Sequence, residues 1–301
     1  MRIEEAAGLF FQYLELERGC SPCTTAAYRG DLQGLQRFLE AEGLETTVKV
    51  LTPPLLRRYV SWLASSGYSP ATIARRMYAI SSLCKYLVNY GHAEVNPCGQ
   101  VVLPKKVRRM PAVLTLEEAR RVLKVADDHA CPWMGFRNRA IVAVLVFCGL
   151  RRQELVDVKI SDIDLRSRWL KVRKGKGGKG RSIPLAPEAA EAIRDWLEFR
   201  PEVDHEYLLT GLGGRRLDKN GLVCVFHGAA KRAGVERRGV SLHTLRHTFA
   251  SLLLQEGADL VSIQELLGHS DLSTTAIYLH MDAAHLQGAV GRHPLSGIGQ
   301  S

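Results

Sequence analysis

The chain has 301 residues, 46% of them hydrophobic, which allows two modest hydrophobic cores because single domains usually contain ~100–200 residues. Its 41 lysines and arginines against 31 acidic residues give a net charge of +10, which favours a polyanionic partner. Seven scattered cysteines, no N-terminal signal peptide and no apolar run of transmembrane length argue against a secreted or membrane protein. We therefore expect free thiols and a cytoplasmic protein without a membrane partner.

The first 104 residues contain an internal repeat with an offset of 48 residues. GCSPCTTAAYRG begins at Gly19 and GYSPATIARRMY begins at Gly67. Serine followed by proline is typical of a helix N-cap and the first helical position, so each copy predicts a capped helix. Further helices are expected to begin near Ile3 and Thr52. Residues 1–104 therefore predict a small helical domain built from two helical hairpins.

A short basic linker is predicted at residues 105–110. Pro97 and Pro104 interrupt the helical pattern before it. Residues 1–104 carry 10 basic and 9 acidic side chains, whereas the linker alone adds four positive charges. A solvated linker is one interpretation, but this charge density also suits the phosphates of a duplex. The candidate phosphate contacts are Lys105, Lys106, Arg108 and Arg109.

Residues 111–301 predict a second, mainly helical domain with one small antiparallel sheet. Thr115-Leu-Glu-Glu118 has the pattern of a capping box that opens a helix. The apolar run from Ile141 to Phe147 predicts a buried helix. Between about Ile163 and Leu185 the pattern changes to strands that flank a glycine-rich turn. Helices return near Glu188.

The predicted β-hairpin is the most positive region of the chain, with eight lysines and arginines and no acidic residue from Arg166 to Arg181. Its glycines allow the backbone to approach another surface closely. The turn lacks the GxxxxGK[ST] pattern, which argues against a nucleotide-binding P-loop. Candidate DNA contacts here and on the second repeated helix are Arg173, Lys174, Lys179, Arg75 and Arg76, although an exposed helix face explains the last two equally well.

The last third of the chain carries residue types suited to phosphodiester cleavage. His243-Thr-Leu-Arg246 places an imidazole and a guanidinium on one face of a helix. His269 and Tyr278 follow, and Arg151 stands earlier in FCGLRRQEL. A tyrosine nucleophile has a pKa of ~10, so it needs cations that favour the phenolate and the pentavalent transition state. Zinc is not expected, because the HExxH glutamate and a third ligand are missing.

In this order, the motifs resemble the tyrosine recombinases of the phage integrase family, and within it the Xer type. They are FCGLRRQEL, GKGGKGRSIPL, SLHTLRHTFASLLLQEGADLVSIQELLGHSDLSTTAIYLH and the late His293-Pro294. The resemblance extends from about Gly19 to Pro294 and implies a helical core-binding domain followed by a catalytic domain. It implies the catalytic residues Arg151, Lys176, His243, Arg246, His269 and the nucleophile Tyr278, with Glu154 in a supporting role.

The resemblance also implies an activity. The expected protein is a site-specific recombinase that cleaves and rejoins a double-stranded DNA site through a 3′-phosphotyrosyl intermediate and a Holliday junction, without metal or ATP. It implies a homotetramer, or a heterotetramer with a related recombinase, assembled on DNA at the nucleoid by exchange of the C-terminal segment. Dimer resolution of chromosomes or plasmids and integration or excision of mobile elements both fit. The alternatives are a type IB topoisomerase-like enzyme and a non-catalytic DNA-binding regulator.

Overall fold

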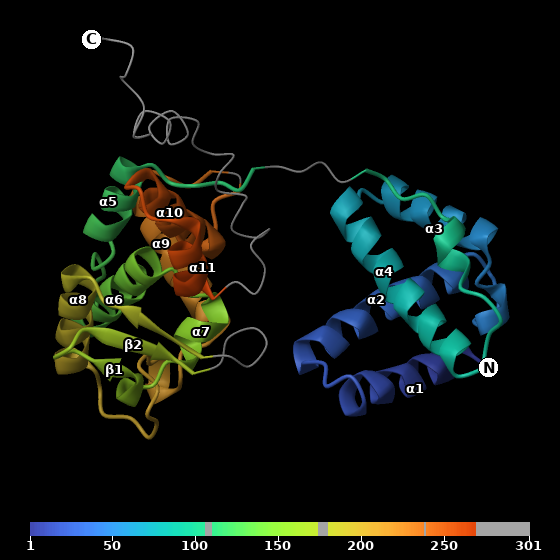
Figure 1. The fold of residues 1–301 in the computed structure, drawn as a ribbon, viewed down its shortest axis with the longest axis horizontal. Coiled ribbons are helices and arrows are strands. Elements are labelled where there is room, and N and C mark those ends of the chain that lie inside the picture. The colour runs from blue at the N-terminus through green and yellow to red at the C-terminus, as the bar shows by residue number, and fades with distance from the viewer. Residues whose placement is uncertain (106–109, 174–179, 238, 269–301) are drawn as a thin grey trace, which may run out of the picture. The chain divides into compact units, whose positions relative to one another are not determined.

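The computed structural model describes residues 1–105, 110–173, 180–237 and 239–268 (Figure 1). The chain divides into two compact units, Met1–Arg109 and Met110–Ser301. Both are mainly helical, and the second adds a small three-stranded antiparallel sheet, so the predicted fold class is confirmed. Within the described ranges, no helix is long and apolar enough to cross a bilayer.

The first unit is a bundle of four α-helices with two short 3₁₀ helices. Its elements are α1 (Ile3–Leu16), α2 (Pro22–Ala41), η1 (Val48–Val50), α3 (Pro53–Ser65), α4 (Pro70–Asn89) and η2 (Pro97–Gln100). The repeat predicted from the sequence is confirmed, because α2 and α4 begin in the same way. The hydroxyl oxygens of Ser21 and Ser69 accept the backbone N–H of the residue three positions later, at 3.3 and 3.2 Å.

Aromatic and aliphatic side chains from all four helices form the core of the first unit. Phe10 packs edge-on against Tyr28, and Phe38 packs against Tyr59 and Trp62. Phe10, Phe38 and Tyr59 are almost completely buried, and packing of this kind supplies most of the stability of a helical bundle because isolated helices are marginal in water.

The second unit contains seven α-helices among its described residues. Its elements are α5 (Leu116–Lys124), α6 (Pro132–Cys148), α7 (Arg152–Asp157), η3 (Ile160–Asp162), β1 (Ile163–Asp164), β2 (Trp169–Val172), β3 (Arg181–Pro184), α8 (Pro187–Phe199), η4 (Leu212–Gly214), α9 (Lys219–Arg232), α10 (Leu242–Gln255) and α11 (Leu260–Leu267). The capping box predicted at Thr115 opens α5, with both reciprocal hydrogen bonds present. In the sheet, Leu170 of β2 pairs with Ile183 of β3, and both side chains are buried.

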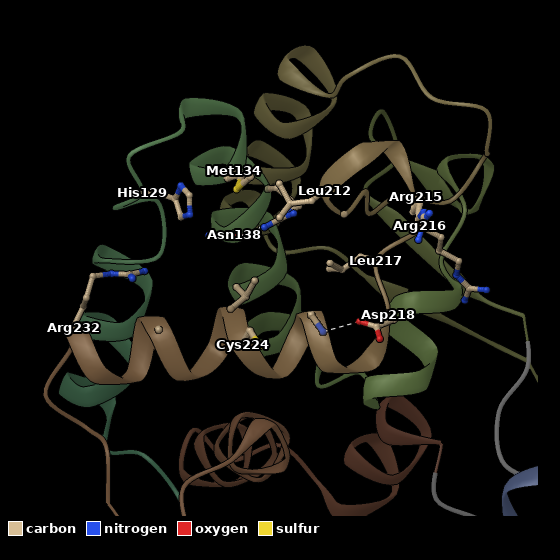
Figure 2. A pocket seen from close by; sticks show the side chains of 15 residues that line it. His129, Met134, Asn138, Leu212, Arg215, Arg216, Leu217, Asp218, Cys224 and Arg232 are labelled. Carbon is tan, nitrogen blue, oxygen red and sulfur yellow. Dashed lines mark hydrogen bonds between the residues drawn. The ribbon is translucent and has the colours of Figure 1, made fainter.

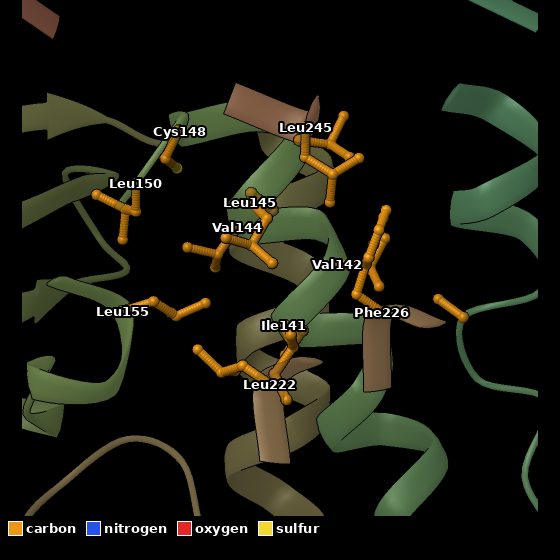
Figure 3. Close-up of a cluster of buried hydrophobic side chains, with 14 of the residues drawn as sticks. Ile141, Val142, Val144, Leu145, Cys148, Leu150, Leu155, Leu222, Phe226 and Leu245 are labelled. Carbon is orange, nitrogen blue, oxygen red and sulfur yellow. The ribbon is translucent and has the colours of Figure 1, made fainter. Parts of the chain in front are cut away.

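Helix α6 is the centre of the second hydrophobic core. It packs against α8, α9 and α10 (Figure 1). Ile141, Val144 and Leu145 are almost completely buried together with Leu222, Phe226 and Leu245 of the surrounding helices (Figure 3). Because α6 is apolar on every side from Ala140 to Cys148, it cannot shift without exposing hydrophobic surface. The C-terminus of α6 is therefore held in place by the core, and this fixes where the residues that follow it begin.

Candidate active site

Arg246 is a buried cation on α10, with 6% of the residue exposed. Its Nη1 donates to the carbonyl oxygen of Gly149 and its Nη2 to that of Leu267, both at 2.7 Å. These carbonyls lie at the C-terminal ends of α6 and α11, where the partial negative charge of a helix favours a cation. These two backbone acceptors, both at hydrogen-bonding distance, hold the plane of the Arg246 guanidinium in one orientation.

Arg151 follows the end of α6 by three residues and is the N-cap of α7. Gly149 makes this exit possible, since its φ of +58° is left-handed and a Cβ there would lie 2.4 Å from the Phe249 ring. The Nη1 of Arg151 donates to Glu154 Oε1 at 2.7 Å, and its Nη2 donates to the carbonyl oxygen of Gly268 at 2.8 Å. Arg151 is thus held from both sides.

Glu154 is a buried carboxylate shared by two arginines. Arg181 of β3 contacts both of its oxygens, at 2.9 and 2.8 Å, while the backbone N–H of Arg151 donates to Oε2 at 2.8 Å. Burial by itself would raise the pKa of Glu154, but the hydrogen bonds from Arg181 and Arg151 outweigh it and lower the pKa to about 2. The carboxylate therefore stays ionised and ties β3 to α7.

Three successive carbonyls at the end of α11 each receive a different arginine. Leu266 accepts Arg181 Nε at 2.7 Å, Leu267 accepts Arg246, and Gly268 accepts Arg151. The last carbonyls of a helix have no partner within the helix, so they are free to bind these donors. The arginines come from β3, α10 and the start of α7, and this end of α11 gathers them into one cluster.

His243 lies in the first turn of α10, three residues before Arg246, as the HxxR spacing predicts. The residue is exposed, but part of its ring is desolvated. That desolvation, with the positive charges of Arg152, Arg246 and Arg151, lowers the pKa of His243 below its usual value. A neutral imidazole beside cations is suited to accept a proton or to donate a hydrogen bond to a phosphate oxygen.

Of the residues predicted for catalysis, the structure brings together Arg151, Glu154, His243 and Arg246. The predicted residues Lys176, His269 and Tyr278 lie outside the described residues, as do the candidate DNA contacts Lys174, Lys179, Lys106, Arg108 and Arg109. Gly268, which immediately precedes His269, is described and lies against the Arg181 guanidinium. A Cβ there would lie 2.9 Å from Arg181 Nη1, and its φ is +63°.

Three of the four remaining candidate DNA contacts, all arginines, are engaged in ion pairs or packing. Arg75 pairs with the buried Asp31, yet about half of its side chain stays exposed. The side chain of Arg76 is only 11% exposed, and its guanidinium packs over the Tyr68 ring at 4.1 Å. Arg76 would have to leave this ring to reach a duplex. Arg173 pairs with Asp162 and keeps half of its side chain exposed, while Lys105 is exposed.

Arg181 is a site residue that the sequence pattern did not predict. It appeared only as one of eight basic residues in the hairpin. Its partners Glu154 and Leu266 are 27 and 85 residues away along the chain. One of these acceptors is a backbone carbonyl, which leaves no pattern in the sequence. Arg181 begins a strand and pairs with the buried Val172 of the neighbouring strand. This position indicates a packing role for Arg181, and it does not indicate a contact with a carboxylate.

Comparison with known proteins gives two family matches and many relatives. The phage integrase family model matches residues 112–285, and the model of its N-terminal SAM-like domain matches residues 8–91. Tyrosine recombinase XerC of Mycobacterium sp. (strain JLS) is 38% identical over 295 residues, covering 95% of this chain and 97% of the relative. Tyrosine recombinase XerD of Listeria monocytogenes serovar 1/2a is 34% identical over 284 residues, covering 92% and 94%.

Solved structures show the same fold. The XerH site-specific recombinase in its post-cleavage complex with a palindromic difH substrate is 25% identical with a TM-score of 0.74, covering 95% of this chain and 84% of that one. A lambda integrase dimer bound to a COC′ core site is 20% identical with a TM-score of 0.73, covering 91% and 97%, and this likeness concerns the fold.

The SAM-like model matches within the first unit, and the phage integrase model matches within the second, which holds the arginine cluster. The chain belongs to the phage integrase family, as a tyrosine recombinase of the Xer type. Its activity is site-specific recombination by cleavage and rejoining of DNA, and the topoisomerase and regulator alternatives are not supported.

Proposed function

We propose that the chain exchanges DNA strands through a 3′-phosphotyrosyl intermediate in which Tyr278 is the nucleophile. The Tyr278 oxygen would form a bond to the scissile phosphorus while the bond from phosphorus to the 5′ oxygen breaks. The phenolic proton passes to a nearby base, and the 5′ oxygen leaves as a hydroxyl. Rejoining is the same step in reverse with a different 5′ hydroxyl, so the bond energy is conserved and no ATP is consumed.

Arg151 and Arg246 are proposed to bind the two non-bridging oxygens of the phosphate. Both guanidinium groups are planar forks that match phosphate oxygens, and both are fixed in advance by carbonyl acceptors. Such pre-organised cations stabilise charge that develops in the transition state without reorganising at the moment of reaction. Glu154 and Arg181 hold Arg151 in place and need not touch the substrate.

His243, His269 and Lys176 are proposed to move protons. His243, with its lowered pKa, is neutral at pH 7 and suited to accept the phenolic proton or to hydrogen-bond a phosphate oxygen. Lys176 is proposed as the general acid that protonates the leaving 5′ oxygen. Lys174 and Lys179 are the alternatives for this role, since the register of the glycine-rich turn is not fixed by sequence.

The observation that carries this proposal is the meeting of Arg151, Arg246 and Arg181 at the carbonyls of residues 266–268. The next residue in the chain is His269. Three elements therefore converge directly before the segment that carries His269 and Tyr278 in the sequence, and such a cluster of cations suits attack on a phosphodiester. Arg151 and Arg181 share the single carboxylate of Glu154, so that carboxylate neutralises only part of the positive charge of the cluster.

The substitution Tyr278→Phe tests the nucleophile. It should leave DNA binding intact and abolish the covalent intermediate, because only the phenolic oxygen is lost. A nicked suicide duplex traps the adduct, which is measured by gel electrophoresis under denaturing conditions. Tyr207→Phe is the matched control and should form the adduct at the native level. A Tyr278→Phe protein that forms the adduct in equal yield would overturn the assignment.

The proposal extends to the assembly on DNA. We propose a double-stranded recombination site gripped by both units, with Arg75, Lys105, Lys106, Arg108, Arg109, Arg173, Lys174 and Lys179 as candidate phosphate contacts. The neighbour structures include a lambda integrase tetramer bound to a Holliday junction, which supports a tetramer of this chain, alone or with a related recombinase. The segment after Tyr278 is proposed to pass into the neighbouring subunit. Relatives named XerC and XerD support the Xer type, and the proposed roles are dimer resolution of chromosomes or plasmids at the nucleoid and integration or excision of mobile elements.

A further inference from the structure

A cavity of about 520 Å³ lies along α9 in the second unit, and none of the proposed catalytic residues lines it. Its volume is within the range of small-molecule sites. Figure 2 shows His129 and Arg232 near one end of α9, Arg215 and Asp218 near the other, and Asn138 between them. Four arginines and one aspartate line it, so the wall is positively charged. We call it the Arg137 cavity, after its most buried cation.

Arg137 is buried without a carboxylate. Only 6% of the residue is exposed, and within the described residues its guanidinium forms no ion pair. It donates to the Asn138 side-chain oxygen from Nε at 3.3 Å and from Nη2 at 3.0 Å, and to the Thr210 carbonyl oxygen from Nη1 at 2.9 Å. Its Cζ also lies 5.3 Å from the centre of the Trp133 ring. These are neutral partners, and a buried charge left with neutral partners is costly.

The donors beside Arg137 are not all used. An arginine has five N–H groups, and the three bonds above leave one on each terminal nitrogen. Because arginine only donates, the Asn138 oxygen must face Arg137, so the amide NH₂ group points elsewhere. Among the described residues, no acceptor contacts that NH₂ group. The groups around Arg137 therefore offer surplus donors, whereas the one carboxylate of the cavity wall, Asp218, caps α9.

The other arginines of the cavity differ in how far they are neutralised. Arg216 pairs with Asp157 and also donates to the Val156 carbonyl oxygen, and Arg232 lies 3.7 Å from Asp128. The Arg215 guanidinium is exposed and, within the described part of the chain, forms no ion pair or hydrogen bond. Asp218 is occupied as the N-cap of α9, where it accepts the Gly221 N–H at 2.7 Å. Arg137 and Arg215 thus lack an acid.

We propose that the Arg137 cavity binds a phosphate group, free or carried by a small molecule, held by Arg137, Arg215 and the Asn138 amide. A doubly charged oxyanion supplies the acceptors that the surplus donors lack and neutralises the buried guanidinium. The apolar side chains of Met134, Leu212 and Leu217 at the same cavity leave room for an organic portion of the ligand. Occupancy would stabilise the folded chain, and above the Kd this stabilisation rises with the logarithm of the ligand concentration.

The test is isothermal titration of the full chain with inorganic phosphate and, separately, with adenosine monophosphate, at constant ionic strength. Arg215→Ala should weaken binding about tenfold or more, because a charge-assisted bond to an exposed side chain is lost without disturbing the core. Asn138→Asp should also abolish cavity binding, since the new carboxylate takes the place of the anion, and it should raise the melting temperature measured without phosphate. Tighter binding of the nucleotide than of phosphate would identify an organic ligand, and equal binding a free anion.

Arg194→Ala on the exposed face of α8 is the matched control, as it removes the same charge from the same unit outside the cavity. It should bind like the native chain. Phosphate can also bind at the proposed catalytic arginines, but it does so equally in the native chain and in the three variants. The difference in affinity between these four proteins therefore reports binding in the cavity. Covalent adduct formation on DNA should be unchanged in Arg215→Ala. Equal affinity in all four proteins, an equal loss in Arg194→Ala, or a lower melting temperature for Asn138→Asp would overturn the proposal.

Discussion

At the scale of single residues, backbone acceptors fix the proposed catalytic cations. Arg246 has two carbonyl partners, and Arg151 has one carbonyl and one carboxylate. Arg181 binds the same carboxylate from the opposite side through both of its terminal nitrogens. A change at Arg181 is therefore transmitted to Arg151 through Glu154, although Arg181 need not touch the DNA.

Replacing Arg181 with lysine tests this indirect role. Lysine keeps the charge but has no planar fork, so it cannot bind both Glu154 oxygens and the Leu266 carbonyl at once. We expect duplex binding to stay near native and the single-turnover rate of adduct formation to fall by roughly tenfold to a hundredfold. The rate is measured with a nicked suicide duplex at saturating protein.

A purely structural role for Arg181 predicts a different result. In that case, Arg181→Lys would lower the fraction of active protein but leave the rate of the active fraction unchanged. Active-site titration on the suicide duplex separates the two quantities, and Arg166→Lys in the exposed part of the hairpin is the control.

The histidines of α10 predict a pH dependence of stability. Desolvation, with the charges around them, lowers the pKa of His243 and of His247 in the folded chain. Well above about pH 6.5, both are neutral in the folded and unfolded states alike. As the pH falls below that value, the unfolded chain binds protons that the folded chain does not, so the free energy of unfolding decreases.

Urea unfolding between about pH 5 and 8 measures this effect. The free energy of unfolding of the native chain should fall on the acid side of pH 6.5, and the double variant His243→Gln, His247→Gln should fall less steeply. His227→Gln, at an exposed position on α9, is the control. Parallel curves for the native chain and the double variant would contradict the prediction.

Residue spacing predicted part of this site. His243 and Arg246 are three residues apart, so they lie on the same face of any helix that contains both. Both residues are in α10, as predicted. The partners of Arg246 were not predictable, because Gly149 and Leu267 contribute only their carbonyls. Backbone acceptors have no residue type, and long-range contacts between elements are set by the packing of the whole domain.

At the scale of elements, the starts of helices were predicted correctly where a serine or threonine side chain caps the helix. The Ser-Pro pairs at the starts of α2 and α4, and Thr115 at the start of α5, form the predicted hydrogen bonds. The strand region was also located, with β2 and β3 on either side of the glycine-rich turn. The bonds of Arg181 across to α7 and α11 could not be predicted, since alternation in a four-residue strand indicates which side is buried but not which element covers it.

The turn between β2 and β3 contains the three lysines that compete for the role of general acid. Lys176→Ala should slow cleavage of normal DNA far more than cleavage of a duplex whose 5′ bridging oxygen is sulfur, because a thiolate leaves without protonation. Arg246→Ala should impair both substrates, since its charge acts on the non-bridging oxygens. Rates of adduct formation on the two duplexes are compared.

Lys174→Ala and Lys179→Ala provide the matched controls within the same turn. Each should lose about the same factor on both duplexes, or none. If sulfur rescues one of them and not Lys176→Ala, that lysine is the acid and the expected register of the turn is wrong.

At the scale of the whole molecule, the two units are joined by the most basic short segment outside the hairpin. If this linker neutralises phosphates, the affinity for DNA should fall with salt by a slope near −0.9 for each phosphate contacted. Replacing Lys105, Lys106, Arg108 and Arg109 with alanine should then reduce the slope by roughly three to four units. Fluorescence anisotropy of a labelled duplex over a range of salt concentrations gives the slope.

The outcome separates the two interpretations of the linker. An unchanged slope would mean that its charges remain in solvent in the complex. Replacing four exposed basic residues of the second unit that lie away from the hairpin, among them Arg194 and Lys231, is the control for a general loss of charge.

The end of α11 has a consequence for how this protein can diverge. The three arginines are held there by carbonyl oxygens, and every amino acid supplies the same carbonyl. A substitution at position 266 or 267 therefore leaves the anchoring carbonyl in place as long as α11 keeps its path, although the Leu267 side chain is itself held by packing in the core. Gly149 and Gly268 are constrained differently, because each has a positive φ angle and a Cβ there would lie within 3.0 Å of a neighbouring side chain. A recombinase built in this way can change the surfaces that read its DNA site while its chemistry stays the same.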